Sequence, residues 1–228
     1  MTARSMKLIG NENSACTRSV LMVLKEKNTP VEFVSIDLGT GAHKSDEHLS
    51  LNPFGKVPVL IHGDLTLYES QAINRYLEAI LPGISLIPQD RQDIARMDQW
   101  LSVDSSYFTP QAYALVWQKL FLPMYGGQTD QAVVKEAEEK LNAIYAAMDH
   151  AIGEEGRFLV GDSLSLADLA FVQYTDYILK AQSESIVFNY ENVRRWWYGL
   201  TQRESYKDPL SVIPVSYTHL TLPTIYSV

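Results

Sequence analysis

Residues 52–70 read NPFGKVPVLIHGDLTLYES and carry the strongest fold signal in the chain. Within them, Val57–His62 and Leu65–Tyr68 are apolar segments separated by Gly63-Asp64, a two-residue connection typical of a β-hairpin. Asn52-Pro53 interrupts the chain just before the hairpin, and a helical pattern follows directly after it. The stretch therefore predicts two antiparallel strands and then a helix.

A second strand-helix pattern lies upstream of this hairpin. The short apolar run Met6–Ile9 and the segment Val31–Ile36 both predict strands, and Ser14 stands at the N-cap position of a helix between them. A helix between two strands this close in sequence is typical of a βαβ unit with parallel strands. A short helix over Asp46–Leu51 and a longer one over Glu69–Ile80 complete a small α/β domain.

The rest of the chain predicts helices only. We assign residues 1–81 to the α/β domain, residues 82–90, rich in proline and glycine, to a linker, and residues 91–213 to an all-helical domain. Pro110 predicts a bend or an end in the first helix, and Ser165 with Asp168 predicts a capping box. The faces at helical spacing are Met97, Trp100, Leu101, Asp104 and Phe108; Val133, Ala137, Leu141, Ile144 and Met148; and Val193, Trp196, Trp197 and Leu200.

Residues 214–228 point to a different origin. Read back as codons, Pro214–Thr224 reproduces in one frame the adapter of a transposase-based sequencing library, and residues 225–227 fall where its barcode would stand. We therefore expect this tail to be adapter read-through and exclude it from fold and function. The alternative is a genuine uncharged tail rich in Thr and Tyr.

Composition and charge exclude several functional classes. The 228 residues are 46% hydrophobic and 20% charged, as in an ordinary soluble globular protein. The 27 acidic residues outnumber the 19 basic ones, and a net charge of −8 disfavours broad attraction to nucleic acids and anionic membranes. The single cysteine, Cys16, rules out an internal disulfide and a multi-cysteine metal site. With neither a signal peptide nor a transmembrane segment predicted, we expect a cytoplasmic protein that binds no metal, nucleic acid or membrane.

Two predicted helix starts provide anion sites. Ser14 precedes the first helix, where unpaired backbone N–H groups and the helix dipole stabilise a thiolate. Glu69-Ser70 opens another helix, which suits the carboxylate of an amino acid, with Glu69 available for its ammonium group.

Two loops complete the predicted site. If the Val57–Pro58 peptide bond is cis, the Val57 backbone faces outward and can pair with an extended peptide. His43 and Lys44 supply donor or positive groups on a loop bounded by glycine. A peptide with a thiol in its middle and a carboxylate at each end would satisfy all of these features.

These segments resemble the glutathione-binding segments of cytosolic glutathione transferases, most closely the phi class, over residues 7–207. The resemblance implies a thioredoxin-like α/β domain followed by an all-α domain, a homodimer, and glutathione as co-substrate with no further cofactor. The segments that carry it are Gly10-Asn11-Glu12-Asn13-Ser14-Ala15-Cys16-Thr17-Arg18, Gly41-Ala42-His43-Lys44, Asn52-Pro53-Phe54-Gly55-Lys56-Val57-Pro58, Tyr68-Glu69-Ser70, and Gly161-Asp162 with Ser165-Leu166-Ala167-Asp168.

By resemblance, the reaction is conjugation of glutathione to small hydrophobic electrophiles, with some peroxide reduction as a side activity. A free thiol with a pKa of ~8.5 is only a few per cent ionised at neutral pH, so a hydroxyl that donates a hydrogen bond to the thiolate accelerates attack. Ser14 is the candidate for this catalytic role. The candidate glutathione-binding residues are His43, Lys44, Lys56, Val57, Glu69 and Ser70, with Lys56 standing where many phi-like members have Gln.

The electrophile site and the dimer contact have aromatic candidates. Tyr107, Phe108, Tyr113 and Trp117 cluster around Pro110 and are expected to wall an apolar cleft, with burial in the core as the alternative for each. Phe54 is expected to anchor the dimer, with burial in its own subunit as the alternative.

Three other functions stay open at this level. Cys16 follows Ser14 by two positions, so a cysteine-type thiol transferase that forms mixed disulfides is one alternative, although we expect Cys16 to be a packing residue. A non-catalytic carrier of glutathione or of hydrophobic ligands is the second. An interaction module that uses the fold only to dimerise is the third.

Overall fold

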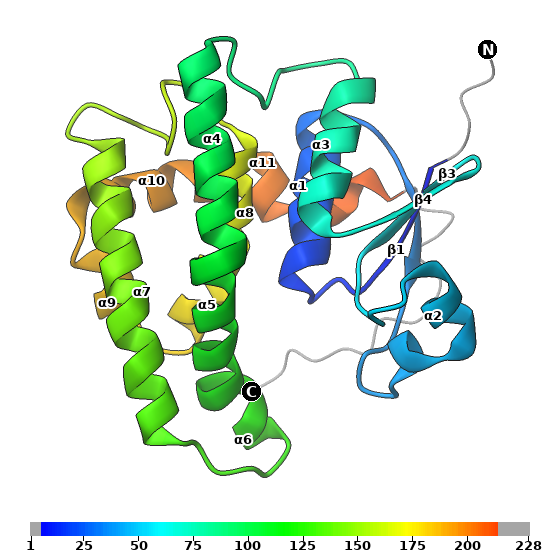
Figure 1. Cartoon of the computed structure of the whole chain (residues 1–228), viewed down its shortest axis with the longest axis horizontal. Coiled ribbons are helices and arrows are strands. Elements are labelled where there is room, and N and C mark those ends of the chain that lie inside the picture. The colour runs from blue at the N-terminus through cyan, green and yellow to red at the C-terminus, as the bar shows by residue number, and fades with distance from the viewer. Residues whose placement is uncertain (1–5, 214–228) are drawn as a thin grey trace.

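The computed structural model describes residues 6–213, so the expectation for residues 214–228 lies outside it. The first part of the chain forms a four-stranded sheet, with α1 and α3 between this sheet and the helical part (Figure 1). Its elements are β1 (Met6–Gly10), α1 (Ala15–Glu26), β2 (Glu32–Ser35), α2 (Asp46–Leu51), β3 (Val59–His62), β4 (Leu65–Tyr68) and α3 (Ser70–Ile80).

The sheet has the mixed order β2-β1-β3-β4 of a thioredoxin-like domain. Strand β1 pairs parallel to β2 and antiparallel to β3, so that Leu8 lies opposite both Phe33 and Leu60. The hairpin of β3 and β4 is antiparallel, as the sequence predicts. Strand β3 begins at Val59, after a Val57–Pro58 peptide bond that is cis.

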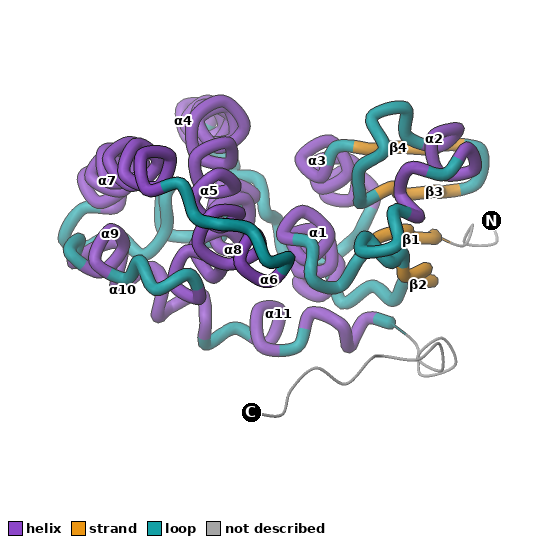
Figure 2. The backbone as a smooth tube through the Cα atoms, turned by 90° about the horizontal axis from the view of Figure 1, so that it is seen from below, coloured by secondary structure: helices purple, strands orange, loops and turns teal. Residues whose placement is uncertain are grey.

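The second part of the chain is all helical, which confirms the predicted fold class (Figure 2). Helix α3 ends at Ile80 and α4 begins at Arg91. The helices are α4 (Arg91–Val103), α5 (Thr109–Val116), α6 (Leu122–Met124), α7 (Gln131–Ile152), α8 (Leu166–Lys180), α9 (Ser185–Phe188), α10 (Glu191–Thr201) and α11 (Glu204–Lys207).

Helices α4, α5 and α6 follow one another without leaving helical geometry. A π-helical turn, Asp104–Phe108, joins α4 to α5, and a second one, Trp117–Phe121, joins α5 to α6. Pro110 is the second residue of α5 and does not end the helix, so the prediction of an end there was wrong. The π-helical turn already departs from regular α-helical hydrogen bonding before Pro110, so the missing N–H of the proline is accommodated.

The predicted apolar face of α7 is shifted at two positions. Val134 and Tyr145 are buried, whereas the neighbouring Val133 and Ile144 are only partly buried. The apolar periodicity was therefore right, but the choice between adjacent apolar residues was wrong at these positions.

The capping box of α8 is present as predicted. The Asp168 carboxylate accepts hydrogen bonds from the Ser165 backbone N–H and hydroxyl, each at 2.9 Å. It also accepts from the Leu159 N–H and the Trp196 indole N–H at 2.9 Å. One buried carboxylate thus joins the start of α8 to α10 and to the preceding loop.

Helix α1 packs against α8 and so joins the two parts of the molecule. The Arg18 guanidinium donates to the Gln173 side chain at 2.8 Å, and the Ser19 hydroxyl donates to the Leu169 carbonyl at 3.2 Å. These contacts place the start of α1 beside the helical part, where the candidate site lies.

Candidate active site

Ser14 is the N-cap residue of α1. Its Oγ accepts a hydrogen bond from the Thr17 N–H at 3.3 Å, and its own N–H donates to the Asn11 carbonyl at 2.9 Å. The side chain is half-buried. A hydroxyl accepts and donates at once, so capping leaves the Ser14 proton available for a bound anion.

The second helix start is held in an unusual backbone conformation. Glu69, the N-cap of α3, has φ 70°, a left-handed value that costs a non-glycine residue on the order of 1 kcal/mol. Ser70 follows as the first residue of α3, and it lines the same small cavity as Cys16 of α1. The starts of α1 and α3 therefore meet side by side.

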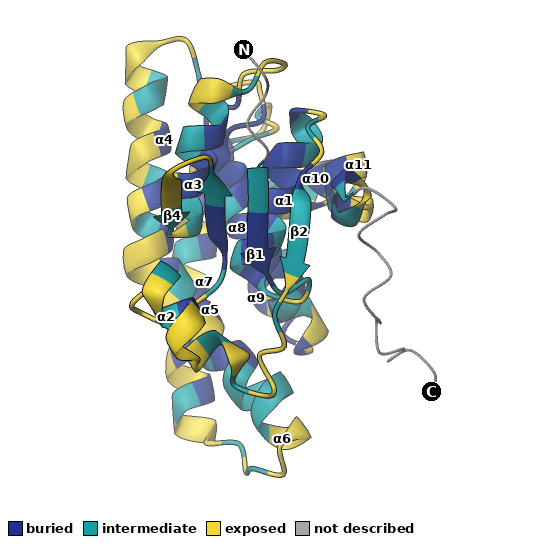
Figure 3. Cartoon of the chain, turned by 90° about the vertical axis from the view of Figure 1, so that its right-hand side faces the viewer, coloured by how far each residue is buried: buried dark blue, intermediate teal, exposed yellow. Residues whose placement is uncertain are grey.

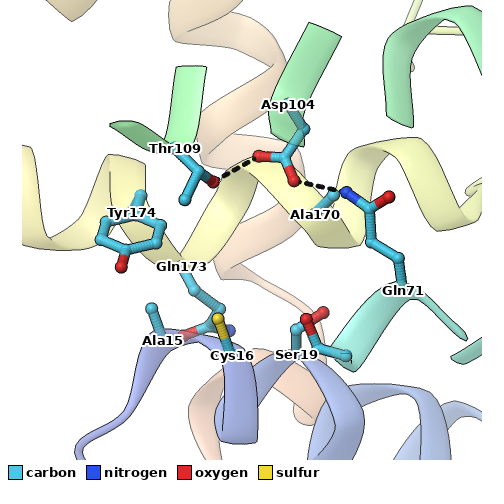
Figure 4. Close-up of a pocket in the computed structure, with 10 residues that line it drawn as sticks. Ala15, Cys16, Ser19, Gln71, Asp104, Thr109, Ala170, Gln173 and Tyr174 are labelled. Atoms are coloured by element: carbon cyan, nitrogen blue, oxygen red, sulfur yellow. Dashed lines mark hydrogen bonds between the residues drawn. The ribbon is translucent and has the colours of Figure 1, made fainter. Parts of the chain in front are cut away.

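A small cavity lies where α1, α3, α8 and the end of α4 come together (Figure 4). Its volume is about 20 Å³, which is room for one water molecule. Cys16, Ser70, Gln71 and Asp104 contribute polar atoms to its wall. This cavity lies behind the helix starts and is too small to hold a peptide ligand itself.

Asp104 is a buried carboxyl group in that wall, with only 6% of its surface exposed. Gln71 Nε2 donates to one of its oxygens at 2.6 Å and Thr109 Oγ1 donates to the other at 2.9 Å. Burial raises the pKa of Asp104 to about 6, and the two hydrogen bonds oppose that rise. The sequence signal for this residue was an aspartate at helical spacing on the apolar face that contains Met97 and Phe108.

Cys16 does not have the environment of a reactive cysteine. Burial is the main cause that raises the pKa of its thiol, and the negative charge of Asp104 adds to the rise. The hydrogen bond from Ser70 acts in the opposite direction. A thiol held protonated in this way is a poor nucleophile at neutral pH.

Lys56 and Glu69 also lie near the start of α1. The positive charge of Lys56 lowers the pKa of Cys16 and the negative charge of Glu69 raises it. Lys56 and Glu69 are therefore close enough to the first turn of α1 for their charges to act on Cys16.

His43 and Lys44 belong to a single 3₁₀ turn, Ala42–Lys44, packed on the loop before the cis peptide bond. The Lys44 ammonium donates to the Phe54 carbonyl at 3.1 Å. Desolvation, followed by the electrostatic effects of Lys44 and His48, holds the pKa of His43 below its ordinary value. At neutral pH, His43 is therefore a neutral hydrogen-bonding group, and the positive charge of this turn comes from Lys44.

Aromatic side chains line the surface of α5 and the π-helical turn after it. Tyr113, 51% exposed, stacks on Trp117 with ring centres 6.1 Å apart, and Trp117 stacks on Tyr125 at 6.2 Å. Phe121 lies between Trp117 and Tyr177 of α8. The sequence prediction included Tyr113 and Trp117 but missed the other three, although aromatic residues recur every four positions from 113 to 125.

This aromatic row reaches the β1–α1 loop. The Tyr177 hydroxyl donates to the Asn13 carbonyl, directly before Ser14. The row therefore borders the same site from the helical side.

The prediction that Phe108 lines the cleft was wrong. Its side chain is fully buried and packs against Tyr145 and Phe171 in the core of the helical part. The apolar stripe that includes Phe108 already marked this face as core, because it also contains Met97 and Leu101. Tyr107, its neighbour on the π-helical turn, is exposed to solvent.

Two family models match this chain. The glutathione S-transferase N-terminal domain matches residues 4–79, and the glutathione S-transferase C-terminal domain matches residues 106–204. The chain belongs to the glutathione S-transferase family. It is 37% identical over 205 residues to glutathione S-transferase F13 of Arabidopsis thaliana, a match that covers 89% of this chain and 93% of that protein.

Solved structures of this family share the whole architecture. Glutathione transferase F7 of Populus trichocarpa superposes with a TM-score of 0.83 at 33% identity, covering 91% of this chain and 98% of that one. Glutathione S-transferase I of maize, solved with an atrazine–glutathione conjugate, has a TM-score of 0.81 at 36% identity, covering 91% and 97%. This glutathione transferase is therefore an enzyme with the thioredoxin-like and helical fold of its family, and it is phi-class-like.

The described part of this transferase has no metal-binding cluster and no membrane helix. Within residues 6–213, no three His, Cys, Asp or Glu side chains gather as metal ligands. No helix in that range combines the length and apolar character needed to cross a bilayer.

Proposed function

We propose that this transferase conjugates glutathione to small hydrophobic electrophiles and that Ser14 stabilises the attacking thiolate. The observation that carries the proposal is the Ser14 hydroxyl at the N-terminus of α1, which accepts from Thr17 and donates to no acceptor within residues 6–213. A hydrogen bond to a charged sulfur is worth about 1.5–3 kcal/mol, enough to shift the bound thiol toward thiolate. No basic partner for Ser14 is required, because the nucleophile belongs to the substrate.

Glutathione recognition is assigned to the two helix starts and the cis loop. The start of α3 at Glu69-Ser70 would hold the γ-glutamyl end, with Glu69 facing its ammonium group. The Val57 backbone would pair with the cysteinyl part, and His43, Lys44 and Lys56 would face the remaining carboxylate. The charges of Lys56 and Glu69, which both act on Cys16 in the first turn of α1, support this placement.

The electrophile is assigned to the aromatic row beside Ser14. Tyr113 and Trp117 would form its inner wall, and Tyr107 stays a candidate for the rim. The contact of Tyr177 with the Asn13 carbonyl supports the assignment, because it brings the row next to the thiol position. A relative that binds an atrazine–glutathione conjugate supports a conjugated aromatic product of this kind.

Further features of the proposal concern assembly and location. We assign a homodimer in the cytoplasm, with glutathione as co-substrate, no other cofactor, and peroxide reduction as a side activity. Phe54 is 62% exposed and its ring meets the edge of Tyr68 at 5.8 Å, which leaves most of it for a partner subunit.

A panel assay tests the proposed function. The chain is bound to immobilised glutathione and then assayed with an aryl halide, an isothiocyanate and an organic peroxide. Turnover of the first two supports conjugation. Retention without turnover would favour the carrier, failure to bind would favour the interaction module, and disulfide reduction through Cys16 would favour the thiol transferase.

A further inference from the structure

His48 is the one buried residue of α2, with 3% of its surface exposed, in a short helix whose other residues are exposed or partly buried (Figure 3). Its Nε2 lies 2.9 Å from the Lys56 carbonyl oxygen. Burial of a polar ring atom is unfavourable unless that atom is hydrogen-bonded. The Lys56 carbonyl is the hydrogen-bond partner that offsets the cost of burying His48 Nε2.

A second donor converges on the same carbonyl. Asn52, the C-cap residue of α2, donates from Nδ2 to the Lys56 oxygen at 2.9 Å. A carbonyl oxygen has two lone pairs, so both donors are accommodated. Because a carbonyl only accepts, Nε2 of His48 carries a hydrogen, and Nδ1 has no partner within the described residues.

Hydrogen bonds within α2 and the loop after it fix the positions of both donors. The Ser45 hydroxyl caps the helix by accepting from the His48 N–H at 3.3 Å. The Asn52 side-chain oxygen accepts from the Phe54 N–H at 3.1 Å, and its carbonyl accepts from the Gly55 N–H at 2.9 Å. The loop from Asn52 to Lys56 is therefore tied to α2 at several points.

The Lys56 carbonyl and the Val57 N–H belong to one planar peptide unit. In a trans peptide these two groups point in opposite directions, so fixing the carbonyl also fixes the direction of the N–H. The next bond, Val57–Pro58, is cis. Within residues 6–213 the Val57 N–H and C=O take part in no hydrogen bond, and the ladder between β1 and β3 starts only at Val59.

We propose that His48 is a positioning residue for glutathione binding. Together with Asn52 it holds the Lys56 carbonyl and thereby aims the Val57 N–H toward the peptide part of glutathione. This inference rests on the proposed function, in which the Val57 backbone pairs with the cysteinyl residue of the ligand. His48 does not touch the ligand or the reacting sulfur.

The test compares two replacements of His48. His48→Phe keeps a buried ring without the donor, and His48→Gln keeps a donor near the Nε2 position. His62→Phe is the matched control, because His62 is a half-buried histidine with one side-chain hydrogen bond, to the Tyr76 hydroxyl at 2.8 Å, on strand β3 outside the site.

We expect His48→Phe to raise the KM and calorimetric Kd for glutathione about 3- to 10-fold, the effect of one lost hydrogen bond. The kcat at saturating glutathione and the KM for the electrophile should stay within about twofold of wild type, and His48→Gln should recover most of the affinity. His62→Phe should leave both glutathione constants unchanged.

Three outcomes would overturn the inference. If the wild type binds glutathione and His48→Phe binds it equally well, His48 positions nothing. If His48→Phe and His48→Gln lose kcat and affinity alike, the residue acts only through stability. If His48→Phe does not fold, hydrogen exchange of the Val57 amide is measured in the wild type instead. If glutathione does not slow that exchange, the inference is wrong. Failure of the wild type to bind glutathione at all would instead remove the proposed function.

Discussion

Gln71 Nε2 donates a 2.6 Å hydrogen bond to the buried carboxylate of Asp104 and a second one, at 3.2 Å, to the Leu101 carbonyl. The second residue of α3 is thereby tied to the end of α4 in the helical part. Since Ser70 directly precedes Gln71, the helical part helps to hold the start of α3, where we place the γ-glutamyl group of glutathione.

The buried Asp104 predicts a pH-dependent stability. Its pKa is raised from 3.8 to about 6, so the folded protein holds this proton over a pH range where the unfolded chain has released it. Stability from this group therefore falls as the pH rises from about 4 to 6, by ~2–3 kcal/mol at most. In urea unfolding between pH 4.5 and 7.5, Asp104→Asn should lack this loss. Asp208→Asn, at an exposed position directly after α11, should follow the wild type, and parallel curves for Asp104→Asn and wild type would contradict the prediction.

Ser14→Ala should lower kcat by about 10-fold or more and raise the pKa of the bound thiol, because it removes a charge-assisted hydrogen bond of ~1.5–3 kcal/mol. Glutathione should still bind. Ser14→Gly separates this role from helix capping, because glycine at an N-cap lowers the stability of a helix by only roughly a few tenths of a kcal/mol. Thiolate absorbance of the enzyme–glutathione complex, titrated against pH, provides the measurement. Identical titration curves for wild type and both variants would refute the role of Ser14.

Cys16→Ser should leave conjugation nearly intact. The thiol is held protonated by burial and by nearby Asp104, and the nucleophile is the sulfur of glutathione. Alkylation of Cys16 by iodoacetamide at neutral pH should be slow, and disulfide reduction should be negligible in both forms. A mixed disulfide at Cys16 detected by mass spectrometry, together with loss of activity in the variant, would establish the cysteine mechanism instead.

S-hexylglutathione should compete with glutathione at comparable affinity, because recognition is assigned to the peptide backbone and charges rather than to the sulfur. Free cysteine lacks both outlying carboxylates and should hardly bind. Glu69→Ala should weaken binding more than Ser70→Ala, because it leaves the ligand ammonium without its partner while the backbone donor at Ser70 survives. Calorimetric titration measures the Kd of both ligands for the wild type and the Kd of glutathione for both variants. Similar affinities for cysteine and S-hexylglutathione would mean that this site does not exist.

Phe54→Ala should weaken the proposed dimer without unfolding the subunit. The ring is largely exposed and packs edge-to-face with Tyr68, so its removal leaves no buried cavity in its own chain. Sedimentation across a range of concentrations should reveal more monomer in the variant, with unchanged unfolding of the subunit. An unchanged association constant would show that Phe54 is not the anchor.

Local sequence patterns were enough to establish the elements. The hairpin of Val59–His62 and Leu65–Tyr68, the caps at Ser14 and Ser165, and the helical second part depend on neighbouring residues, whose preferences act over a few positions. These features follow from turn chemistry, capping and apolar period. These secondary-structure elements and caps could therefore be predicted without knowing how the elements pack.

The packing of the two parts decided what local patterns leave open. Phe108 and Tyr113 both belong to the aromatic cluster around Pro110, yet Phe108 is buried and Tyr113 is exposed. The difference arises because other helices cover the face that contains Phe108 and not the face that contains Tyr113. Asp104 lies on an apolar helix face that the sequence shows, but its partner Gln71 is 33 positions away, so the hydrogen bond that satisfies its carboxylate has no local signature.

His48 shows the same division at the glutathione site. Its sequence neighbours predict only a polar position on a short helix, whereas the fold turns its ring inward onto the Lys56 carbonyl. Short-range preferences specified the secondary structure and the helix caps of this transferase. The three-dimensional packing specified which side chains form the site, because a polar group is buried where the fold supplies a hydrogen-bond partner.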